Sequence, residues 1–393
     1  MVAAGPAVRE VSSAGAAAGS LYFELLGLVG VGWVQMARGE LRQAAETLRL
    51  VLRRIAGQEG QTYAFAGTAH TGLGWVLREW NHLESAEQQL RTSIELTTRW
   101  NISALMLRGY FQLARVRQAR GDAAGALELI AQADQAMRRS SGGLLVGVVA
   151  ACQAQLWLQQ GNLAAAKHWA TTVSLDPDQP ITLLGELERL ALVRVQIAQG
   201  RAEEALQALD RLRTMVETAG RDGSVLEILL LQALAQLRIG NSAQAIARLA
   251  QALARAEPEG YVRLFVDEGP VMEAMLRQML AAQRSHRLAA PHSSGAYLEH
   301  LLAAFGGSPA PGAPSRAAAP STAQTQALIE PLNARELAVL RLLASGKSNA
   351  AIARELIVAP STIKWHLKHL YAKLQVHSRA QAVACARQLQ LLE

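Results

Sequence analysis

Cysteine, aromatic residues and long apolar runs are scarce in this 393-residue chain, and each scarcity excludes a class of protein. The two cysteines, Cys152 and Cys385, lie far apart inside apolar runs, which gives no support to a disulfide framework or a thiolate metal site. Aromatic residues make up 5% of the chain, whereas half of all residues are hydrophobic and Ala and Leu dominate. Because Gly and Pro lie mostly between the apolar runs, we expect an almost all-α protein.

The longest apolar run near the start spans residues 25–36, which is too short to cross a bilayer. Arg9 is followed directly by Glu10, so no basic leader precedes this run. We therefore expect a cytoplasmic protein with no membrane partner, and a reducing compartment fits two unpaired thiols.

Motifs for catalysis and nucleotide binding are also missing. The chain has no G-x-x-x-x-G-K-[ST], and its only Gly-Lys-Ser, at residues 346–348, lacks the upstream glycine. It has neither G-x-S-x-G nor H-E-x-x-H. His366 and His369 lie three residues apart with no carboxylate or cysteine nearby, which disfavours a metal site. We expect neither an enzyme nor a bound cofactor or metal.

A repeat of about 40 residues runs through the first part of the chain. Six turn residues, separated by 42, 40, 40, 39 and 40 positions, mark it: Gly39, Asn81, Gly121, Gly161, Gly200 and Gly240. An alanine follows each turn five residues later: Ala44, Ala86, Ala126, Ala166, Ala205 and Ala245. Another apolar residue precedes each turn by five: Val34, Val76, Val116, Leu156, Val195 and Ala235.

This spacing predicts a helix hairpin in each repeat. Gly or Asn can adopt the left-handed conformation that ends a first helix, and the alanine lets the second helix pack closely on the first. A hairpin cannot bury its apolar face alone, so six of them should stack into a right-handed α-solenoid with a concave surface.

Four tryptophans of the repeat region, Trp33, Trp75, Trp157 and Trp169, have two interpretations. They line a groove for an effector, or they belong to the core. Trp33 and Trp75 each lie six residues before a turn, and an equivalent position in two repeats favours the core.

Residues 306–327 contain four prolines and no acidic residue, which is typical of a linker. The expected organisation is therefore a flexible N-terminus at 1–20, a repeat domain at 21–305, the linker, and a C-terminal domain at 328–393. Positive charge is concentrated in that last part. Residues 331–393 hold nine Lys or Arg and three Glu, or +6 of the total +7, which favours a polyanionic partner.

The C-terminal domain has the pattern of four short helices. Asn333 can cap the first, Ser348 the second and Ser378 the fourth, while Pro360 suits the start of the third. A tight turn between the second and third helices is typical of a helix-turn-helix DNA-binding unit, whose third helix reads the groove. The buried stripe of this reader would be Ile363, Leu367, Leu370 and Leu374. Its outward face and flanks would present Ser361, Thr362, Lys364, Trp365, Lys368 and His369.

Residues 332–386 resemble the C-terminal DNA-binding domain of the LuxR family, through "LNARE", "GKSN", "STIKWHL" and "KLQVHSRAQA". The resemblance implies base or groove contacts from Lys364, Trp365 and Lys368, and phosphate contacts from Thr362 and Lys347. It also implies dimerisation through the fourth helix, at Arg379, Ala382, Val383 and Ala386. Ala359 stands where the family usually has a capping Ser or Thr, which removes about 1 kcal/mol of helix capping.

The segment "EGYVRLFVDEGPVMEAML", residues 259–276, resembles the end of the sensor region in the MalT-like, ATP-dependent members of that family. The repeats before it resemble tetratricopeptide repeats. Those regulators carry an ATPase module ahead of their repeats, and this chain has no such motif, so it is either a shortened regulator or part of a longer one.

The expected function is sequence-specific transcriptional regulation. Double-stranded DNA would be bound as a homodimer, and the repeat domain would sense a small molecule or a protein. The alternative is a protein-interaction scaffold whose basic domain binds DNA weakly or non-specifically.

Overall fold

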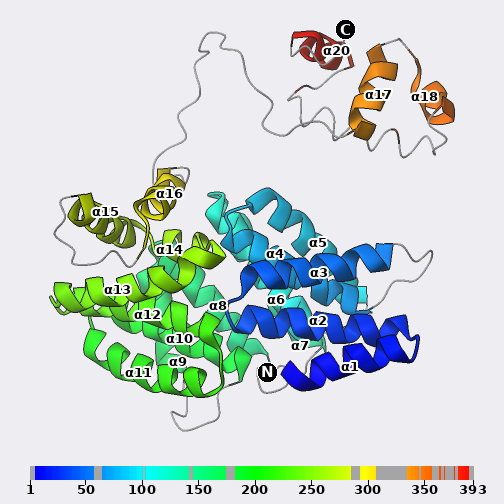
Figure 1. Ribbon diagram of the computed structural model, residues 1–393. Helices are drawn as coiled ribbons and strands as arrows, with labels where there is room; N and C mark the ends of the chain where they lie inside the picture. Colours follow the sequence, from blue (N-terminus) through cyan, green and yellow to red (C-terminus); the bar gives the residue numbers. More distant parts are fainter. Residues whose placement is uncertain are drawn as a thin grey trace. The chain divides into compact units, whose positions relative to one another are not determined.

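The computed structural model confirms an all-α protein: the residues that it describes form helices and no β-strand (Figure 1). The chain divides into two compact units, residues 1–313 and 314–393, and this division falls inside the predicted linker. No described helix is both long enough and apolar enough for a bilayer span. The described residues are 5–56, 64–99, 101, 103–140, 145–173, 182–284, 293–306, 334–344, 347–355, 363, 367, 376 and 379–388.

Six consecutive hairpins form most of the first unit, as the repeat predicts (Figure 1). Their helices are α2 (Leu21–Ala37) with α3 (Leu41–Ala56), α4 (Ala64–Glu79) with α5 (Leu83–Arg99), α6 (Ser103–Ala119) with α7 (Ala123–Ser140), α8 (Val146–Gln159) with α9 (Leu163–Thr172), α10 (Leu183–Ala198) with α11 (Ala202–Thr218), and α12 (Asp222–Arg238) with α13 (Ser242–Ala256).

The predicted turn residues adopt the left-handed conformation that their spacing indicates. All six have a positive φ, from 62° at Asn81 to 84° at Gly240. At Gly200, for example, the amide of Arg201 donates to the Gln196 carbonyl at 2.9 Å and so ends α10. The alanine five residues after each turn is fully buried in all six hairpins, which confirms the close packing of the second helix on the first.

The hairpins curve until the sixth meets the first. Helix α12 packs against α2, and a Cβ atom added to Gly223 would lie 2.9 Å from the Met36 carbonyl oxygen. Glycine at this position therefore permits the contact that closes the ring. Side chains from α2, α4, α6, α8, α10 and α12 line one shared cavity, so we call these the inner helices. The second helices of the hairpins are the outer helices.

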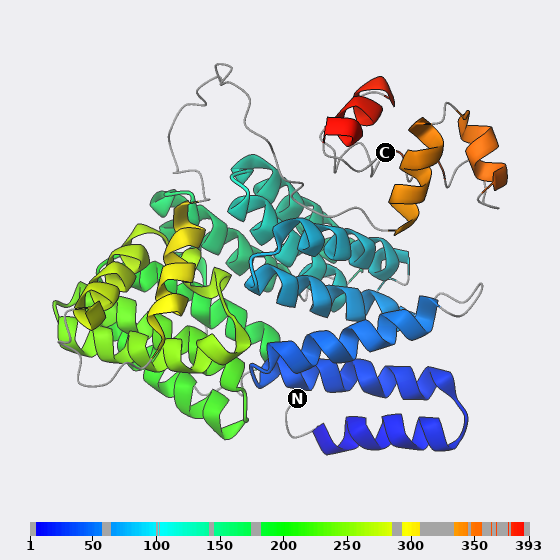
Figure 2. The same cartoon turned by 45° about the horizontal axis from the view of Figure 1, so that its top comes forward.

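The first unit also contains a helix where we predicted a flexible N-terminus over residues 1–20. Helix α1 (Gly5–Ala17) lies along α2 (Figure 2). A Cβ on Gly15 would lie 2.4 Å from the Glu24 amide nitrogen, and one on Gly27 would lie 2.5 Å from the amide nitrogen of Ser12. The prediction is wrong for residues 5–17 because glycines let the two backbones approach closely, without the apolar stripe that marks most packed helices.

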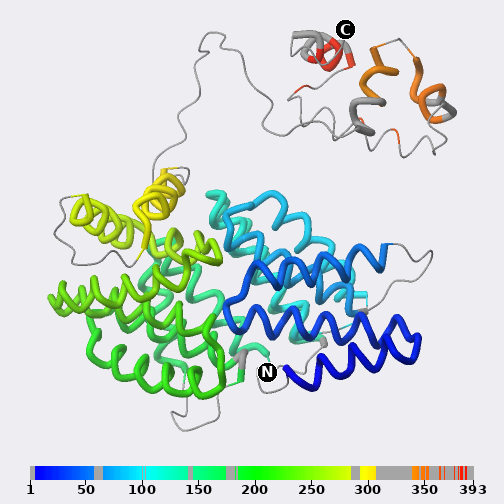
Figure 3. The backbone as a smooth tube through the Cα atoms, in the orientation of Figure 1, coloured from blue at the N-terminus to red at the C-terminus, as the bar shows by residue number. Residues whose placement is uncertain are grey.

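After the sixth hairpin the chain returns to the first two, as the trace in Figure 3 shows. The backbone amide of Val262 donates to the Glu79 carbonyl at 2.8 Å, and Trp80 Nε1 donates to the Glu259 carbonyl at 2.8 Å. The short helix α14 (Arg263–Val266) packs on α4, and α15 (Pro270–Arg284) and α16 (Gly295–Gly306) pack on each other beyond it.

The second unit contains α17 (Ala334–Ala344), α18 (Asn349–Glu355) and α20 (Arg379–Gln388). The Ser348 hydroxyl accepts a hydrogen bond from the Ala351 amide at 3.3 Å, which confirms the predicted cap of α18. Ile363 and Leu367 are helical and buried, as the reader stripe requires, whereas Leu370 and Leu374 lie outside the described residues. These two side chains share a core with residues of all three helices: Val339, Leu340, Leu343, Ile352, Ala353, Ala382 and Ala386.

Candidate functional site

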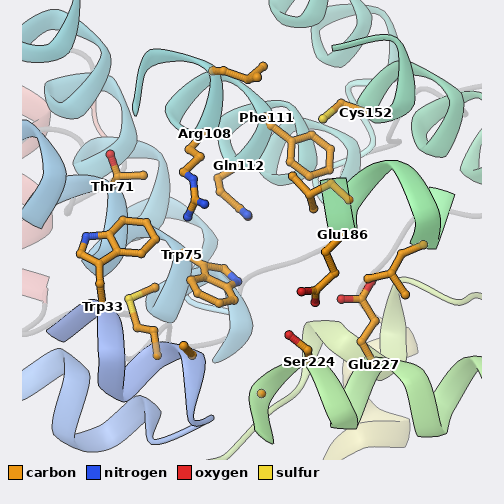
Figure 4. A pocket seen from close by; sticks show the side chains of 16 residues that line it. Trp33, Thr71, Trp75, Arg108, Phe111, Gln112, Cys152, Glu186, Ser224 and Glu227 are labelled. Carbon is orange, nitrogen blue, oxygen red and sulfur yellow. The ribbon is translucent and has the colours of Figure 1, made fainter. Parts of the chain in front are cut away.

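A cavity of about 130 Å³ lies where the six inner helices converge, and we call it the axis cavity (Figure 4). Each inner helix contributes to its lining, for example through Trp33, Trp75, Arg108, Cys152, Glu186 and Glu227. Residues almost 200 positions apart therefore share one wall. This convergence is a consequence of ring closure, since the α2 and α12 side chains meet only when the sixth hairpin contacts the first.

Trp33 and Trp75 are half-buried, pack against the main apolar core and also line the axis cavity, so the two interpretations do not exclude each other. Their shared repeat position turns each indole towards the axis, where the cavity takes the place of a packed neighbour. The Trp75 Nε1 donates to Glu79 Oε1 at 3.3 Å, which fixes that ring. Trp169 is 6% exposed within a separate apolar cluster, as the core interpretation predicts, and Trp157 packs against the same cluster.

Arg108 and Gln112 extend from α6 into the axis cavity (Figure 4). The Arg108 guanidinium lies 4.9 Å from the centre of the Trp33 ring, a cation–π contact that holds its orientation. Burial lowers the pKa of Arg108 to about 10, partly offset by the negative charge of Glu186. Among the described residues, no carboxylate lies within ion-pair distance of this guanidinium.

Acidic side chains from α10 and α12 line another part of the cavity wall (Figure 4). Glu186 accepts a hydrogen bond from Arg221 at 2.6 Å, and Glu227 accepts one from Arg194 at 2.8 Å. Burial raises the pKa of Glu186, and the nearby charge of Glu227 raises it further, against the lowering effects of Ser224 and Arg221. Neither arginine lines the cavity, so the cavity itself presents two carboxylates on this side.

The other chemistry of the cavity wall is unreactive. Burial raises the pKa of the Cys152 thiol far above its ordinary range, so the sulfur stays protonated and is a poor nucleophile. Within the described part of the chain, no group of three or more His, Cys, Asp or Glu side chains could hold a metal ion.

A cluster of ion pairs connects the inner helices to the segment that follows α14. Asp267 accepts hydrogen bonds from Arg78 of α4 and Arg263 of α14, and its carboxylate lies 3.5 Å from Arg115 of α6. The next residue, Glu268, accepts a hydrogen bond from Arg194 of α10 at 2.7 Å. We call Asp267 and its three arginines the Asp267 cluster. Through this cluster and Glu268, the segment that resembles the end of a sensor region is fixed to α4, α6 and α10 of the cavity wall.

The predicted DNA-contacting residues are described only in part. Lys347 is half-buried just before α18, and its backbone carbonyl accepts a hydrogen bond from Arg379 Nη2 at 2.9 Å. The other six predicted residues lie outside the described residues: Ser361, Thr362, Lys364, Trp365, Lys368 and His369. Their assignment still rests on the sequence.

The structure corrects part of the predicted dimer contact on α20. Ala382 and Ala386 are fully buried in the core of their own unit, so neither methyl group is available to a second copy. The Arg379 guanidinium also donates to the Leu343 carbonyl at 2.8 Å, which joins α20 to the end of α17. Val383 is half-buried against the same core. Burial removes Ala382 and Ala386 from the predicted dimer contact, whereas Arg379 and Val383 stay predictions.

Sequence reasoning missed Arg108, Glu186 and Glu227 as site residues. A signal was present, because each is a charged residue in the first helix of a hairpin, the helix whose counterparts carry fewer charges than the second helices do. The second helices carry many more charges on their solvent side. Charge alone therefore could not distinguish residues that line the cavity from residues that face solvent.

Two family models match the chain. Residues 1–282 match the MalT-like TPR region, where TPR denotes the tetratricopeptide repeat, and residues 330–386 match the bacterial regulatory proteins of the luxR family. The first match covers more than half of the chain and agrees with the six hairpins. The second contains all the described helices of the C-terminal unit except the last residues of α20.

Similar proteins include HTH-type transcriptional regulators MalT. The one from Yersinia enterocolitica is 28% identical over 390 residues, covering 94% of this chain and 41% of that protein. The one from Vibrio parahaemolyticus is 28% identical, covering 91% and 40%. The chain thus spans about 41% of the length of such relatives. A similar fold occurs in the Rap conjugation gene regulator of the plasmid pLS20, solved with the Phr* peptide, with a TM-score of 0.50, 13% identity, and coverage of 74% and 75%.

Proposed function

The chain belongs to the family of the MalT-like TPR region, and from this premise we propose that it is a sequence-specific DNA-binding transcription regulator whose helical ring senses an effector. The observation that carries the proposal is the combination of a closed ring with a lined cavity and a LuxR-type C-terminal unit in one chain. An effector bound in the axis cavity would contact all six hairpins at once.

DNA binding is assigned to the third helix of the C-terminal unit. Lys364, Trp365 and Lys368 would contact base edges or the groove, Ser361, Thr362 and His369 the flanking groove or backbone, and Lys347 a phosphate. The burial of Ile363 and Leu367 supports this orientation, because a helix that buries this stripe directs Lys364 and Lys368 away from the core. The excess positive charge of residues 331–393 would make affinity fall steeply with salt.

The effector would be a small molecule rather than a peptide. A cavity of about 130 Å³ is close to the size of a cavity that holds a single benzene ring, about 150 Å³. It is lined by helices that belong to different repeats, so a bound molecule would stabilise ring closure. Contacts to several repeats would give the ligand a direct effect on the arrangement of the hairpins.

The test of DNA binding is the double substitution Lys364→Ala and Lys368→Ala in the full chain. Each lost base contact should cost about 1–3 kcal/mol, so affinity for a specific promoter fragment should fall by at least about 30-fold. Electrophoretic mobility shift and fluorescence anisotropy at several salt concentrations measure it. Lys373→Ala is the matched control, because this lysine is on the same expected helix but at the edge of the reading face, and it should have a much smaller effect.

Retention of full promoter affinity by the double variant would show that the reader is assigned wrongly. The alternative function, a protein-interaction scaffold, is distinguished by mapping the bound chromosome sites. A regulator should give discrete promoter peaks that disappear with the double substitution. A scaffold should give only diffuse background in both proteins.

A further inference from the structure

The axis cavity presents opposite charges on different helices. A single guanidinium, Arg108, reaches it from α6, whereas the carboxylates of Glu186 and Glu227 reach it from α10 and α12 (Figure 4). Apolar groups, including Trp75 and Phe111, form much of the remaining wall. This arrangement favours a ligand that itself carries two opposite charges separated by a short apolar part.

Arg108 is a half-buried cation without an ion-paired carboxylate. Its guanidinium stacks on Trp33 and is partly stabilised by the charge of Glu186, but no carboxylate of the described residues lies within ion-pair distance of it. A buried charge without a partner is costly, and a guanidinium offers a planar fork of donors that matches a carboxylate. The nearby Trp33 Nε1 is also buried without a hydrogen-bond partner among the described residues. Both groups are donors, and an anion would satisfy the unpaired positive charge.

The two carboxylates on the acidic side of the cavity, unlike Arg108, have ion-pair partners. Arg221 and Arg194 bind Glu186 and Glu227 from outside the cavity and fix their positions. The Glu227 side chain is 28% exposed, the most of these four side chains, and its second oxygen has no hydrogen bond within the described residues. Two carboxylates that repel each other bind a shared cation favourably, because the cation removes the repulsion. The buried, unpaired Oε1 of Gln112 is a further acceptor in the wall.

We propose that the axis cavity binds a small aminocarboxylate, with its carboxylate on Arg108 and its ammonium group at Glu186 and Glu227. The volume of about 130 Å³ is suited to a molecule of amino-acid size. This inference rests on the proposed function, because it names the chemical class of the effector that the ring would sense. A neutral ligand would leave Arg108 unpaired, and a ligand with one charge would satisfy only one side.

The experiment measures binding to the full chain by thermal shift and isothermal titration calorimetry. The probes are the twenty proteinogenic L-amino acids, β-alanine and γ-aminobutyrate. At least one should raise the melting temperature and give a saturable heat. The N-acetyl form of that probe lacks the ammonium group and its carboxamide form lacks the carboxylate, so each should bind at least tenfold more weakly. A neutral polyol of similar size, myo-inositol, should not bind.

Two substitutions with matched controls locate the site. Arg108→Gln should abolish binding, whereas Arg49→Gln removes another guanidinium that stacks on a tryptophan, outside the cavity, and should have no effect. Glu227→Gln should weaken binding at least tenfold. Its control is Glu268→Gln, because both carboxylates bind Arg194, at 2.8 and 2.7 Å, but only Glu227 lines the axis cavity. Binding that survives Arg108→Gln would overturn the site.

Failure of this inference differs from failure of the proposed function. If no aminocarboxylate binds, or if myo-inositol binds equally well, the ligand class is wrong while promoter binding by the parent chain still supports a regulator. If the Lys364→Ala and Lys368→Ala variant binds promoters like the parent, the DNA-reading assignment is wrong, whatever occupies the cavity.

Discussion

Inner and outer helices of the ring differ in how much of their surface they bury, although each hairpin contains one of each. The outer helix α11 buries five of its 17 residues, at spacings of three and four that define a single stripe: Ala202, Ala205, Leu209, Leu212 and Val216. Its inner partner α12 buries nine of 17, and no single stripe contains them. The outer helix packs on one side only, whereas the inner helix is enclosed by its neighbours and by the cavity.

The comparison shows where function is encoded in such a ring. A charge on an outer helix is ordinary, because that helix has a solvent-exposed face. A charge on an inner helix must be paired or must face a cavity, since burial of an isolated charge is costly. Arg78 is paired with Asp267 and Arg194 with Glu268. Arg108 faces the axis cavity instead. The comparison predicts that a substitution lowers the free energy of unfolding most where it affects the inner helices and least on the outer surface.

The largest effect is expected from Asp267→Asn, because this carboxylate pairs with arginines of two inner helices, α4 and α6. This change keeps the side-chain size but leaves Arg78, Arg115 and Arg263 with one carboxylate fewer in a buried place. Breaking a buried ion pair from one side costs about 3–5 kcal/mol. Urea unfolding followed by circular dichroism should therefore show a correspondingly lower free energy of unfolding. The exposed pair of Glu299 with Arg284 supplies the control, and Glu299→Gln should change stability by less than about 0.5 kcal/mol. Equal effects of the two substitutions would contradict the expectation that charges paired with the inner helices matter most for stability.

A smaller effect is expected at the turns that join an inner helix to an outer one. Gly200 has a φ of 81°, and a Cβ atom there would meet nothing within 4 Å. Gly200→Ala should thus cost only the backbone strain of the left-handed conformation, about 1–2 kcal/mol. Gly200→Asn should cost less, because Asn tolerates this conformation, as Asn81 does at the equivalent turn with a φ of 62°. An alanine variant as stable as the parent would show that the turn does not constrain the hairpin.

The smallest effect is expected on the outer surface, at Glu87 of α5. Its carboxylate contacts Arg91 at 2.8 Å, Arg117 at 3.0 Å and Arg120 at 2.7 Å, and so connects an outer helix to the end of α6. Partial burial raises the pKa of Glu87, but the three arginines outweigh it and the net pKa is lowered. Glu87→Gln should therefore cost about 1 kcal/mol at neutral pH, as partly exposed ion pairs do.

The pH dependence of this variant follows from the lowered pKa. The unfolded chain binds the proton more tightly than the folded one, so the contribution of Glu87 is present above its ordinary value of 4.5 and is lost as the pH falls below it. Parent and Glu87→Gln should thus converge in stability on acidification. A gap between the two unfolding curves that stays constant from pH 7 to pH 3 would exclude an ionic origin.

Several features could be predicted from the sequence because they depend on local chemistry. The left-handed turns, the buried alanines and the cap at Ser348 all follow from which residue types tolerate a given backbone conformation or a close contact. Helix α1 could not be predicted in this way, because Gly15 and Gly27 contribute backbone proximity instead of an apolar side chain. Ala382 and Ala386 were placed on a dimer surface, although an alanine on a short helix gives no sign of which side is buried.

The sequence by itself determined that the chain contains six helix hairpins and a separate basic module, because both depend on short-range spacing of residue types. Only the tertiary structure decided which helices are inner and what they face. Closure between α2 and α12 brings Trp33 and Glu227 to the same cavity, although 194 positions separate them in the chain. The curvature that closes the ring is the sum of small rotations at each hairpin, and no local pattern records that sum.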